Sequence, residues 1–418
     1  MTQHVRFIHA ADLHLDAPFK GVDATDPRVR DELVSATYGA LDAVVEACIA
    51  NAVDFLVLAG DVYNHAERSL RAEFAFRDAC VRLAEAGIHV YVARGNHDPA
   101  SGWSAGLTLP PEVHVFSADE VERITHERDG EVVCALYGRS FKTAAETANL
   151  AREYHRGADD TLAIGVLHAN VGGLTDHAPY APCSLDDLRA AGMDYWALGH
   201  IHKPEVLSET PSVVYPGCTQ GLNPNESGPR GCRLVTLGPD GVTTGFVPTA
   251  RVAWAREQVR VEDAATLEEV RDALAEAAER CAADAGDVPV VVRYELTGRT
   301  PVHAQLARPG IARDLLADVR ADGLDRPVWI WADRITDATR PAVDLDGLRA
   351  GEDLSGDLVR LADRSLSDDA ETLRLIDEVA RPVLGLLEQR DVPALDAADL
   401  LERARDLALD HLLAGDER

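Results

Sequence analysis

The sequence predicts an α/β protein that continues into a smaller α+β domain and C-terminal helices. In the first part of the chain, short apolar runs alternate with amphipathic stretches of helical period, which is typical of strands and helices around a partly parallel sheet. The chain has 418 residues, too many for one ordinary hydrophobic core, so we expect more than one domain. The pattern changes near Thr249, and we place the first boundary there, giving a first domain of residues 1–250.

The first domain opens with a strand-helix-strand-helix-strand series. We expect strands at residues 5–10, 54–59 and 88–93, because each is a short apolar run that contains β-branched residues. Residues 30–50 and 68–86 carry apolar side chains at helical spacing and are predicted to form helices. In such a series the carboxyl ends of the strands gather on one rim of the sheet.

Two later strands of this domain end in histidine. The predicted strand 161–167 precedes His168, and the predicted strand 195–198 precedes Gly199-His200-Ile201-His202. Further short strands are expected at 212–215, 233–237 and 242–247. The sheet rim therefore receives imidazoles as well as carboxylates.

Side chains of the metal-ligand type follow five of these strands: Asp12, His14, Asp61, Asn96, His168, His200 and His202. Asp12 and His14 are two residues apart, as are His200 and His202, so on extended segments each pair would point the same way. The set suffices for two ions with one bridging carboxylate, and such a pair of ions can bind both oxygens of an in-line phosphoryl displacement. A ligand set of oxygen and imidazole groups without thiolate favours manganese, iron or zinc over copper.

His97 and Asp98 follow Asn96 in the Gly95-Asn96-His97-Asp98 loop. An imidazole at this place can carry a proton, and Asp98 could hold its orientation and raise its basicity.

The net charge of the chain is −30, and the acidity extends over both halves of the sequence. Such a field argues against nonspecific coating of nucleic acid or of an anionic membrane. A local phosphate site is compatible with it, because two divalent ions would reverse the potential at one place.

We expect a cytoplasmic protein without a membrane segment. Residues 1–6 lead directly into a strand, and no apolar run approaches the roughly 18 residues that span a bilayer. The seven cysteines are scattered and include no Cys-x-x-Cys pair, which favours reduced thiols over disulfides or a zinc site.

Five motifs in order, namely Asp-x-His, Gly-Asp, Gly-Asn-His-Asp, a lone strand-end His and Gly-His-x-His, resemble those of the calcineurin-like metallophosphoesterase superfamily. Residues of four segments carry a narrower resemblance. They are similar to the SbcD-like DNA repair exonucleases, especially the YhaO-like bacterial branch, and the segments are 59–63, 215–217, 220–221 and 226–231. The resemblance covers residues 1 to about 250 well. Beyond them, residues 296–301 are similar to a segment of the branch's capping domain.

The resemblance implies a four-layer sandwich and an assignment of the site. Asp12, His14 and His202 would hold one manganese ion, Asn96, His168 and His200 the other, and Asp61 would bridge them. His97, oriented by Asp98, would stabilise the transition state or protonate the leaving oxygen. Some nuclease members have His three residues after the bridging Asp, where this chain has Asn64 followed by His65. That departure bears on double-strand exonuclease activity and leaves the metal site unaffected.

The rest of the chain is predicted to form a small α+β domain at 251–350 and a helical segment at 351–418. The expected elements are strands at 252–261, 288–296 and 328–332 and helices at 265–282 and 312–320. The resemblance makes this domain a cap that helps to hold DNA, and the alternative is a dimer or partner-binding module. An apolar stripe runs from Leu400 to Leu412. The resemblance implies that it docks on a coiled-coil ATPase, and the alternative is that it packs on its own cap.

Together these features predict a manganese-dependent phosphodiesterase, a DNA exonuclease or endonuclease subunit in DNA repair that works as a homodimer with a coiled-coil ATPase. Zinc or iron could replace manganese. A phosphomonoesterase or a nucleotide phosphodiesterase on the same site is the alternative that the −30 charge favours. The Asn64 departure also allows a structural subunit that recruits the ATPase and has weak activity.

Overall fold

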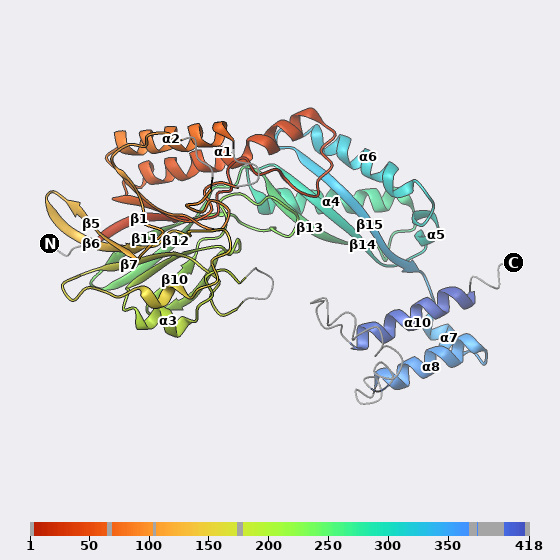
Figure 1. Cartoon of the computed structure of the whole chain (residues 1–418). Coiled ribbons are helices and arrows are strands. Elements are labelled where there is room, and N and C mark those ends of the chain that lie inside the picture. The colour runs from red at the N-terminus through yellow and green to blue at the C-terminus, as the bar shows by residue number, and fades with distance from the viewer. Residues whose placement is uncertain are drawn as a thin grey trace. The chain divides into compact units, whose positions relative to one another are not determined.

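The computed structural model describes residues 4–64, 69–102, 106–173, 179–367, 374 and 397–413 (Figure 1). The chain divides into two compact units. The first comprises 1–257, 277–293 and 318–334, and the second comprises 258–276, 294–317 and 335–418. The domain boundaries expected at 250 and 350 differ from this division and stay predictions.

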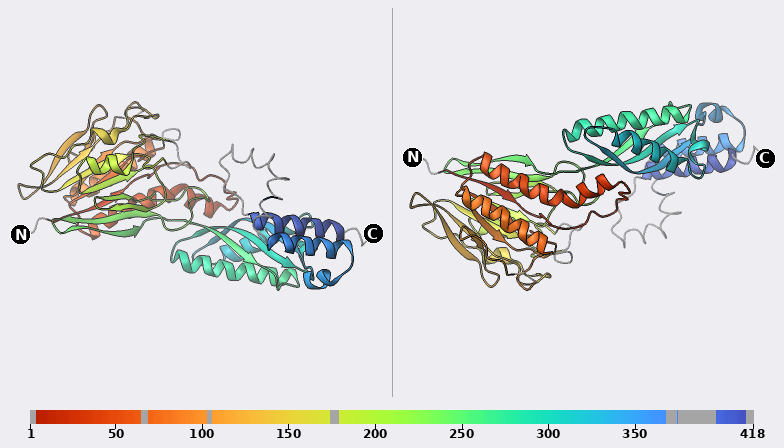
Figure 2. Two further views of the ribbon diagram at one scale, coloured as in Figure 1. Left: turned by 90° about the horizontal axis from the view of Figure 1, so that it is seen from below. Right: turned by 90° about the horizontal axis from the view of Figure 1, so that it is seen from above.

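The first unit contains a six-stranded sheet with the order β12-β11-β1-β2-β3-β4. Its strands are β1 (Val5–Ala10), β2 (Phe55–Ala59), β3 (His89–Ala93), β4 (Val113–Val115), β11 (Gly231–Gly238) and β12 (Gly241–Pro248). Strands β1 to β4 are parallel, whereas β11 runs antiparallel to β1. Helices α1 (Pro27–Ala50) and α2 (Leu70–Glu85) lie side by side along this sheet (Figure 2).

A second six-stranded sheet of this unit has the order β5-β6-β7-β8-β10-β9. Its strands are β5 (Glu122–Arg128), β6 (Glu131–Gly138), β7 (Ala163–His168), β8 (Tyr195–Gly199), β9 (Glu205–Glu209) and β10 (Ser212–Tyr215). Strands β6, β7, β8 and β10 are parallel, and the short helices η1 (Leu150–Glu153) and α3 (Leu185–Ala190) accompany them.

Three apolar clusters hold the layers of the first unit together. One lies between the helices and the first sheet, and it includes Leu41, Phe76 and Leu56. The next lies between the two sheets and includes Phe55 and Ile164. The third lies beyond the second sheet and contains Tyr154, Leu188 and Trp196. The sequence of layers is therefore helix, sheet, sheet, helix, and the predicted α/β sandwich class is confirmed.

Strand β2 shows why the buried strands read as continuous apolar runs. Leu56 and Leu58 belong to the cluster under the helices, while Phe55, Val57 and Ala59 belong to the cluster between the sheets. Because successive side chains point to opposite faces, a strand buried on both faces needs an apolar residue at every position.

Helix α1 is long and apolar enough, by length and composition, to cross a membrane, although we expected no segment of that kind. Half of its apolar window is buried within the protein, and its inward face packs on the first sheet through Leu41, Val44 and Cys48. These contacts are those of a core helix. The helix starts at Pro27, earlier than expected, because the Asp26 side chain accepts hydrogen bonds from the first backbone N–H groups.

The remaining elements include a three-stranded sheet of β13 (Ala253–Arg260), β14 (Val290–Thr300) and β15 (Ile330–Pro341), in that order. The helices are α4 (Leu267–Ala285), α5 (His303–Leu306), α6 (Ile311–Leu324), α7 (Leu345–Ala350), α8 (Leu354–Leu366) and α10 (Ala397–Leu413). Within the second unit α8 packs against α7 and α10, and Asp406 of α10 pairs with Arg299 and Arg340. Of the predicted helical segment, residues 368–373, 375–396 and 414–418 lie outside the described part of the chain.

Candidate metal centre

The loops that follow β1, β2, β3, β7 and β8 are joined by hydrogen bonds at one end of the sandwich. The backbone N–H of His14 donates to the carbonyl of Asp61 at 3.0 Å, which ties the first loop to the second. The N–H of Ala169 donates to the carbonyl of Gly199 at 3.2 Å and ties the loops of the other sheet. The backbone N–H of His200 donates to the carboxylate of Asp12 at 3.0 Å and links the two sheets. In the loop after β3, the N–H of His97 donates to Oδ1 of Asp61 at 2.8 Å, so all the strand ends singled out in the sequence meet.

The backbone at this end departs from extended geometry, contrary to our expectation for the Asp-x-His and His-x-His pairs. Asp12, His14, Asp61 and His200 all have φ between 43° and 100°. Residues other than glycine rarely adopt this left-handed region, and they keep it where the surrounding structure imposes it. The side chains therefore converge because tight loops turn them inward, and the alternation of an extended segment plays no part.

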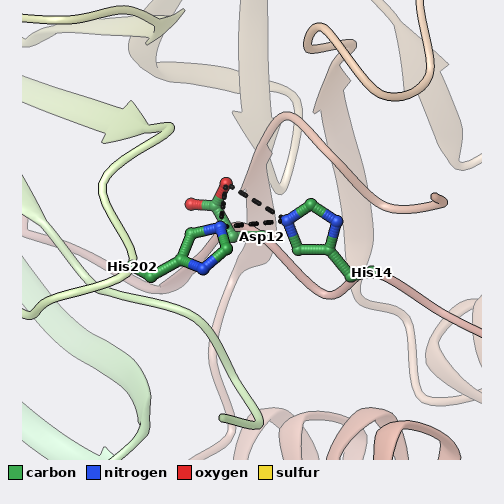
Figure 3. Close-up of side chains that lie close together, drawn as sticks. All are labelled: Asp12, His14 and His202. Carbon is green, nitrogen blue, oxygen red and sulfur yellow. Dashed lines mark hydrogen bonds and ion pairs between the residues drawn. The ribbon is translucent and has the colours of Figure 1, made fainter. Parts of the chain in front are cut away.

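Asp12, His14 and His202 form one cluster of ligand atoms (Figure 3). The Nε2 atoms of His14 and His202 lie 3.1 Å apart, and they lie 4.0 and 3.9 Å from Oδ1 of Asp12. Asp12 and His14 are buried and His202 is partly exposed.

Asp61 connects this cluster to a second one that contains His168. Its Oδ2 atom lies 3.8 Å from Nε2 of His14 and 3.4 Å from Nε2 of His168. Nε2 of His168 also lies 3.0 Å from Oδ1 of Asn96, while Nδ1 of the same ring donates to the carbonyl of Ala59 at 2.9 Å. In its neutral form, with the proton on Nδ1, the His168 ring would present the lone pair of Nε2 on the side of Asp61 and Asn96.

His200 lies beside this second cluster. Its ring makes an edge contact with the ring of His168, with 5.2 Å between the ring centres, and it also faces Tyr180. No ligand group among the described residues includes it. Its assignment as a metal ligand therefore stays a prediction.

His97 is oriented by Asn64, and the expectation that Asp98 orients it is wrong. Nδ1 of His97 donates to Oδ1 of Asn64 at 3.0 Å. The two oxygens of Asp98 instead accept the backbone N–H groups of Val62 at 3.0 Å and of Gly95 at 2.7 Å. Asp98 is buried, and its carboxylate joins the backbone of two loops. His65, which follows Asn64, lies outside the described residues.

Glu226 is a site residue that the sequence analysis missed. It accepts a hydrogen bond from Nδ1 of His202 at 2.8 Å, and Cys218 completes a cluster with these two side chains. Burial raises the pKa of the Cys218 thiol well above its usual value, so the thiol stays protonated. Glu226 belongs to the quoted 226–231 motif, but one sequence alone contains no signal that pairs it with His202.

The charges of this centre depend on one another. Burial raises the pKa of Asp12 to about 6. Burial would raise the pKa of Asp61 too, but His168 and its hydrogen bond hold it well below the usual range. Burial would lower the pKa of His168, yet Asp61 outweighs burial and raises it to about 9. Burial and the neighbouring His202 lower the pKa of His14 to about 3. Several buried ionisable groups without surrounding solvent are typical of functional sites.

The donor set fits divalent metal ions. Donors that bind one ion at roughly 2.0–2.2 Å lie about 3–4 Å from each other, which is the spacing seen around Asp12 and around Asp61. Each ring nitrogen that points away from the centre, Nδ1 of His168 and Nδ1 of His202, already donates to an oxygen. That arrangement prepares the opposite nitrogen of an imidazole for a metal.

Comparison with known proteins identifies two family models in the chain. Residues 5–204 match the calcineurin-like phosphoesterases, and residues 254–340 match the middle domain of metallophosphoesterase YhaO.

Individual relatives agree with these models. The uncharacterized metallophosphoesterase YhaO of Bacillus subtilis (strain 168) is 35% identical over 379 residues, which cover 89% of this chain and 91% of that protein. The DNA double-strand break repair protein Mre11 of Methanopyrus kandleri is 28% identical over 62% of this chain and 59% of its own length. The SbcD subunit of the nuclease SbcCD of Escherichia coli (strain K12) is 24% identical over 54% of this chain and 62% of its own. The chain is a metal-dependent phosphoesterase that belongs to the calcineurin-like metallophosphoesterases, in the SbcD-like and YhaO-like branch.

Proposed function

We propose that the chain is a dinuclear phosphodiesterase that cleaves DNA. One observation carries the proposal: a single oxygen of Asp61 lies within 4 Å of an imidazole nitrogen of each of two ligand clusters. A carboxylate in this position can bridge two ions, and phosphoryl transfer at two ions is the chemistry that such a bridge serves.

In this proposal Asp12, His14 and His202 would hold one ion, Asn96, His168 and His200 would hold the other, and Asp61 would be shared between them. Manganese is the proposed metal, since the donors are oxygen and imidazole only. When bound, the ions supply Lewis-acid stabilisation of the phosphate oxygens and a water of lowered pKa.

The protein's own contribution to the reaction is position and proton transfer. The backbone N–H of His97 donates to Oδ1 of Asp61 at 2.8 Å, which holds the loop of His97 against the centre. Because Nδ1 of the ring donates to Asn64, Nε2 is the atom left to contact a phosphate oxygen or to protonate the leaving group. Asp98 and Gly95 keep this loop in shape from beneath.

DNA as substrate, a role in repair and a partner subunit are supported by the relatives, and the coiled-coil ATPase is the partner that the family resemblance implies. Their names describe DNA double-strand break repair and one subunit of a nuclease. We propose that α8 and α10 receive the partner, because Leu354, Leu361 and Leu407 are exposed on these helices. We propose that the protein is cytoplasmic. The apolar helix α1 is compatible with this location, because its inward face packs in the core of the protein.

A homodimer is supported by the outer face of α2. Leu70, Phe74 and Val81 are 51%, 41% and 38% exposed, and their spacing puts them on one side of the helix. A second copy is the proposed occupant, because an identical stripe is self-complementary about a twofold axis.

The test compares substrates on the purified chain with Mn²⁺. Nucleotides should be released from linear DNA only with the metal, and a nitrophenyl phosphodiester should be cleaved faster than the monoester. Activity confined to the monoester would reject the nuclease. That result would favour the second candidate, a phosphomonoesterase. The net charge of −30 supports this candidate, because so acidic a protein repels long polyanions more than small esters.

A further inference from the structure

Glu226 lies in the segment between β10 and β11 and contacts the ring of His202. The Nδ1–H of His202 donates to Oε1 of Glu226 at 2.8 Å. The opposite nitrogen of the ring, Nε2, then faces His14 at 3.1 Å and Asp12 at 3.9 Å. A carboxylate in this place fixes both the tautomer and the orientation of the imidazole.

The Glu226 carboxylate is itself fixed by its own loop. Nδ2 of Asn223 donates to Oε1 at 2.7 Å, and the backbone N–H of Leu222 donates to Oε2 at 2.6 Å. Both oxygens therefore have donors within the loop, and neither is free to turn away from His202. A side chain held in this way is preorganised, because its rotamer does not have to be found when the metal arrives.

The same segment also holds the backbone of His202. Nη1 of Arg230 donates to the His202 carbonyl at 2.5 Å, and the N–H of Cys218 donates to that carbonyl at 3.1 Å. Nε of Arg230 donates to the carbonyl of Glu226 at 3.1 Å, which connects the two holds. Ring and main chain of His202 thus depend on one loop.

The loop is anchored on strand β13 at its start. Nε1 of Trp254 donates to the carbonyl of Gly221 at 3.1 Å, and Nε of Arg256 donates to the carbonyl of Pro224 at 3.0 Å. Nε2 of Gln220 donates to the carbonyl of Val252 at 2.7 Å. These anchors precede Glu226 and the contacts of Arg230 follow it, so the loop is held on both sides of the carboxylate.

We propose that Glu226 is the positioning residue for His202: it sets the ring so that Nε2 binds one ion of the pair. The inference rests on the proposed metal centre and goes beyond it, since it assigns a role to a residue outside the ligand set. It also implies that the two ions respond differently to the loss of Glu226, because only the ion at Asp12, His14 and His202 depends on this ring.

The experiment is a calorimetric titration of the metal-free full chain with Mn²⁺, with electron paramagnetic resonance of the loaded protein. Wild-type chain should bind two ions and show the signal of an interacting pair. Glu226→Ala should bind one ion with affinity reduced about 10–100-fold and the other as wild type, and it should show a lone ion at limiting metal. Glu226→Gln keeps the side-chain volume but can accept hydrogen bonds through only one oxygen, so its affinity for this ion should lie between those of the wild type and Glu226→Ala. This variant replaces Glu226→Ala in the test if the alanine variant does not fold.

The matched control is Glu122→Ala. Glu122 accepts from Nε2 of His114 at 3.0 Å and from the N–H of Ser117 at 3.0 Å, so it too pairs with a histidine and a backbone donor, away from the ligand clusters. This variant should bind two ions as wild type.

Two results contradict the proposal in different ways. If wild-type chain binds two ions and both Glu226 variants bind them equally well, Glu226 does not position His202, and the metal centre stands. If wild-type chain binds no Mn²⁺, the proposed centre fails and this inference fails with it. Equal weakening of both ions in Glu226→Gln also overturns the inference, because a general loss of structure then explains it.

Discussion

The His168 ring carries a proton in the absence of metal, because burial, which would lower its pKa, is outweighed by Asp61, which raises the pKa to about 9. Below pH 9 the ring is therefore the doubly protonated imidazolium. Mn²⁺ must displace the proton on Nε2 before this nitrogen can bind the metal, since metals bind neutral imidazole. Asp12, with a pKa of about 6, is already ionised at neutral pH and adds no proton there.

We therefore predict that the affinity for Mn²⁺ rises between pH 7 and 9 by up to tenfold per unit and levels off above 9. Calorimetry at pH 7.5 in HEPES and in Tris checks this, since these buffers differ in ionisation heat and about one released proton should add the ionisation heat of the buffer. Equal heats in both buffers would contradict the pKa of His168.

Asn64 accepts from His97 and touches no predicted metal ligand in the described contacts. We predict that Asn64→Ala lowers kcat for a nitrophenyl diester by up to about 100-fold, because a freed ring loses its alignment. The Mn²⁺ affinity should stay unchanged. His97→Ala should lower kcat for the same diester by about 10²–10⁴-fold.

The two changes act on one group, so the double variant should be no slower than His97→Ala. Additive losses would show that Asn64 works by another route. Unchanged diester hydrolysis in His97→Ala with metal bound would remove the proposed role of His97.

At the scale of elements, the loop after β3 passes so close to the centre that position 95 has no room for a side chain. A Cβ at Gly95 would lie 2.3 Å from Oδ1 of Asp61 and 2.9 Å from Cε1 of His168. We predict that Gly95→Ala displaces Asp61 and abolishes tight Mn²⁺ binding, with a stability loss of about 1–3 kcal/mol.

The control for Gly95→Ala is Gly245→Ala on β12, where an added Cβ meets no atom within 4 Å. It should bind Mn²⁺ and unfold as wild type. Normal metal binding by Gly95→Ala would mean that the loop lies farther from Asp61 than the structure has it.

The exposed stripe of α2 predicts how the protein associates. Phe74→Glu should turn a dimer into a monomer in sedimentation velocity, because a charge in the middle of an apolar interface is not compensated. Val206→Glu, at a 45% exposed valine of β9, is the control and should leave the association unchanged. A wild-type chain that is monomeric at all concentrations would refute the dimer.

For the whole molecule, the metal centre links stability to pH. The pKa of His168 is raised on folding, so its contribution is complete below about pH 6.5 and is lost as the pH rises through about 9. The pKa of Asp12 is also raised, so its contribution to stability is lost as the pH rises to about 6. The pKa of His14 is lowered to about 3, so its contribution to stability is lost as the pH falls below about 6.5.

We predict that the Tm of the chelator-treated chain falls between pH 6.5 and 9. Saturating Mn²⁺ should remove this fall, because the ions require the deprotonated rings. At 100-fold excess over Kd each ion should add about 2.7 kcal/mol. Calorimetric scans with chelator and with Mn²⁺ test both statements, and parallel pH profiles would argue against metal at His168.

Much of the fold could be predicted from the sequence. The continuous apolar runs of β1, β2 and β3 indicated strands buried on both faces, and the helical spacing of α1 and α2 indicated the layer above them. The hairpin β5–β6 and the helix α3 were not predicted, because β5 is mostly polar and α3 is short. Short or partly exposed elements leave weak periodicity, and their tertiary contacts decide them.

The sequence by itself determined the residue types of the centre and their places at strand ends, because parallel strands bring their carboxyl ends to one rim whatever the loops between them do. Only the tertiary structure decided which side chain orients which. Asn64 faces His97, Asp98 joins the backbone of Val62 and Gly95, and Glu226 reaches His202 from a distant loop. These partners depend on left-handed turns and on loops that pack across two sheets, and no local pattern in the chain encodes a contact of that range.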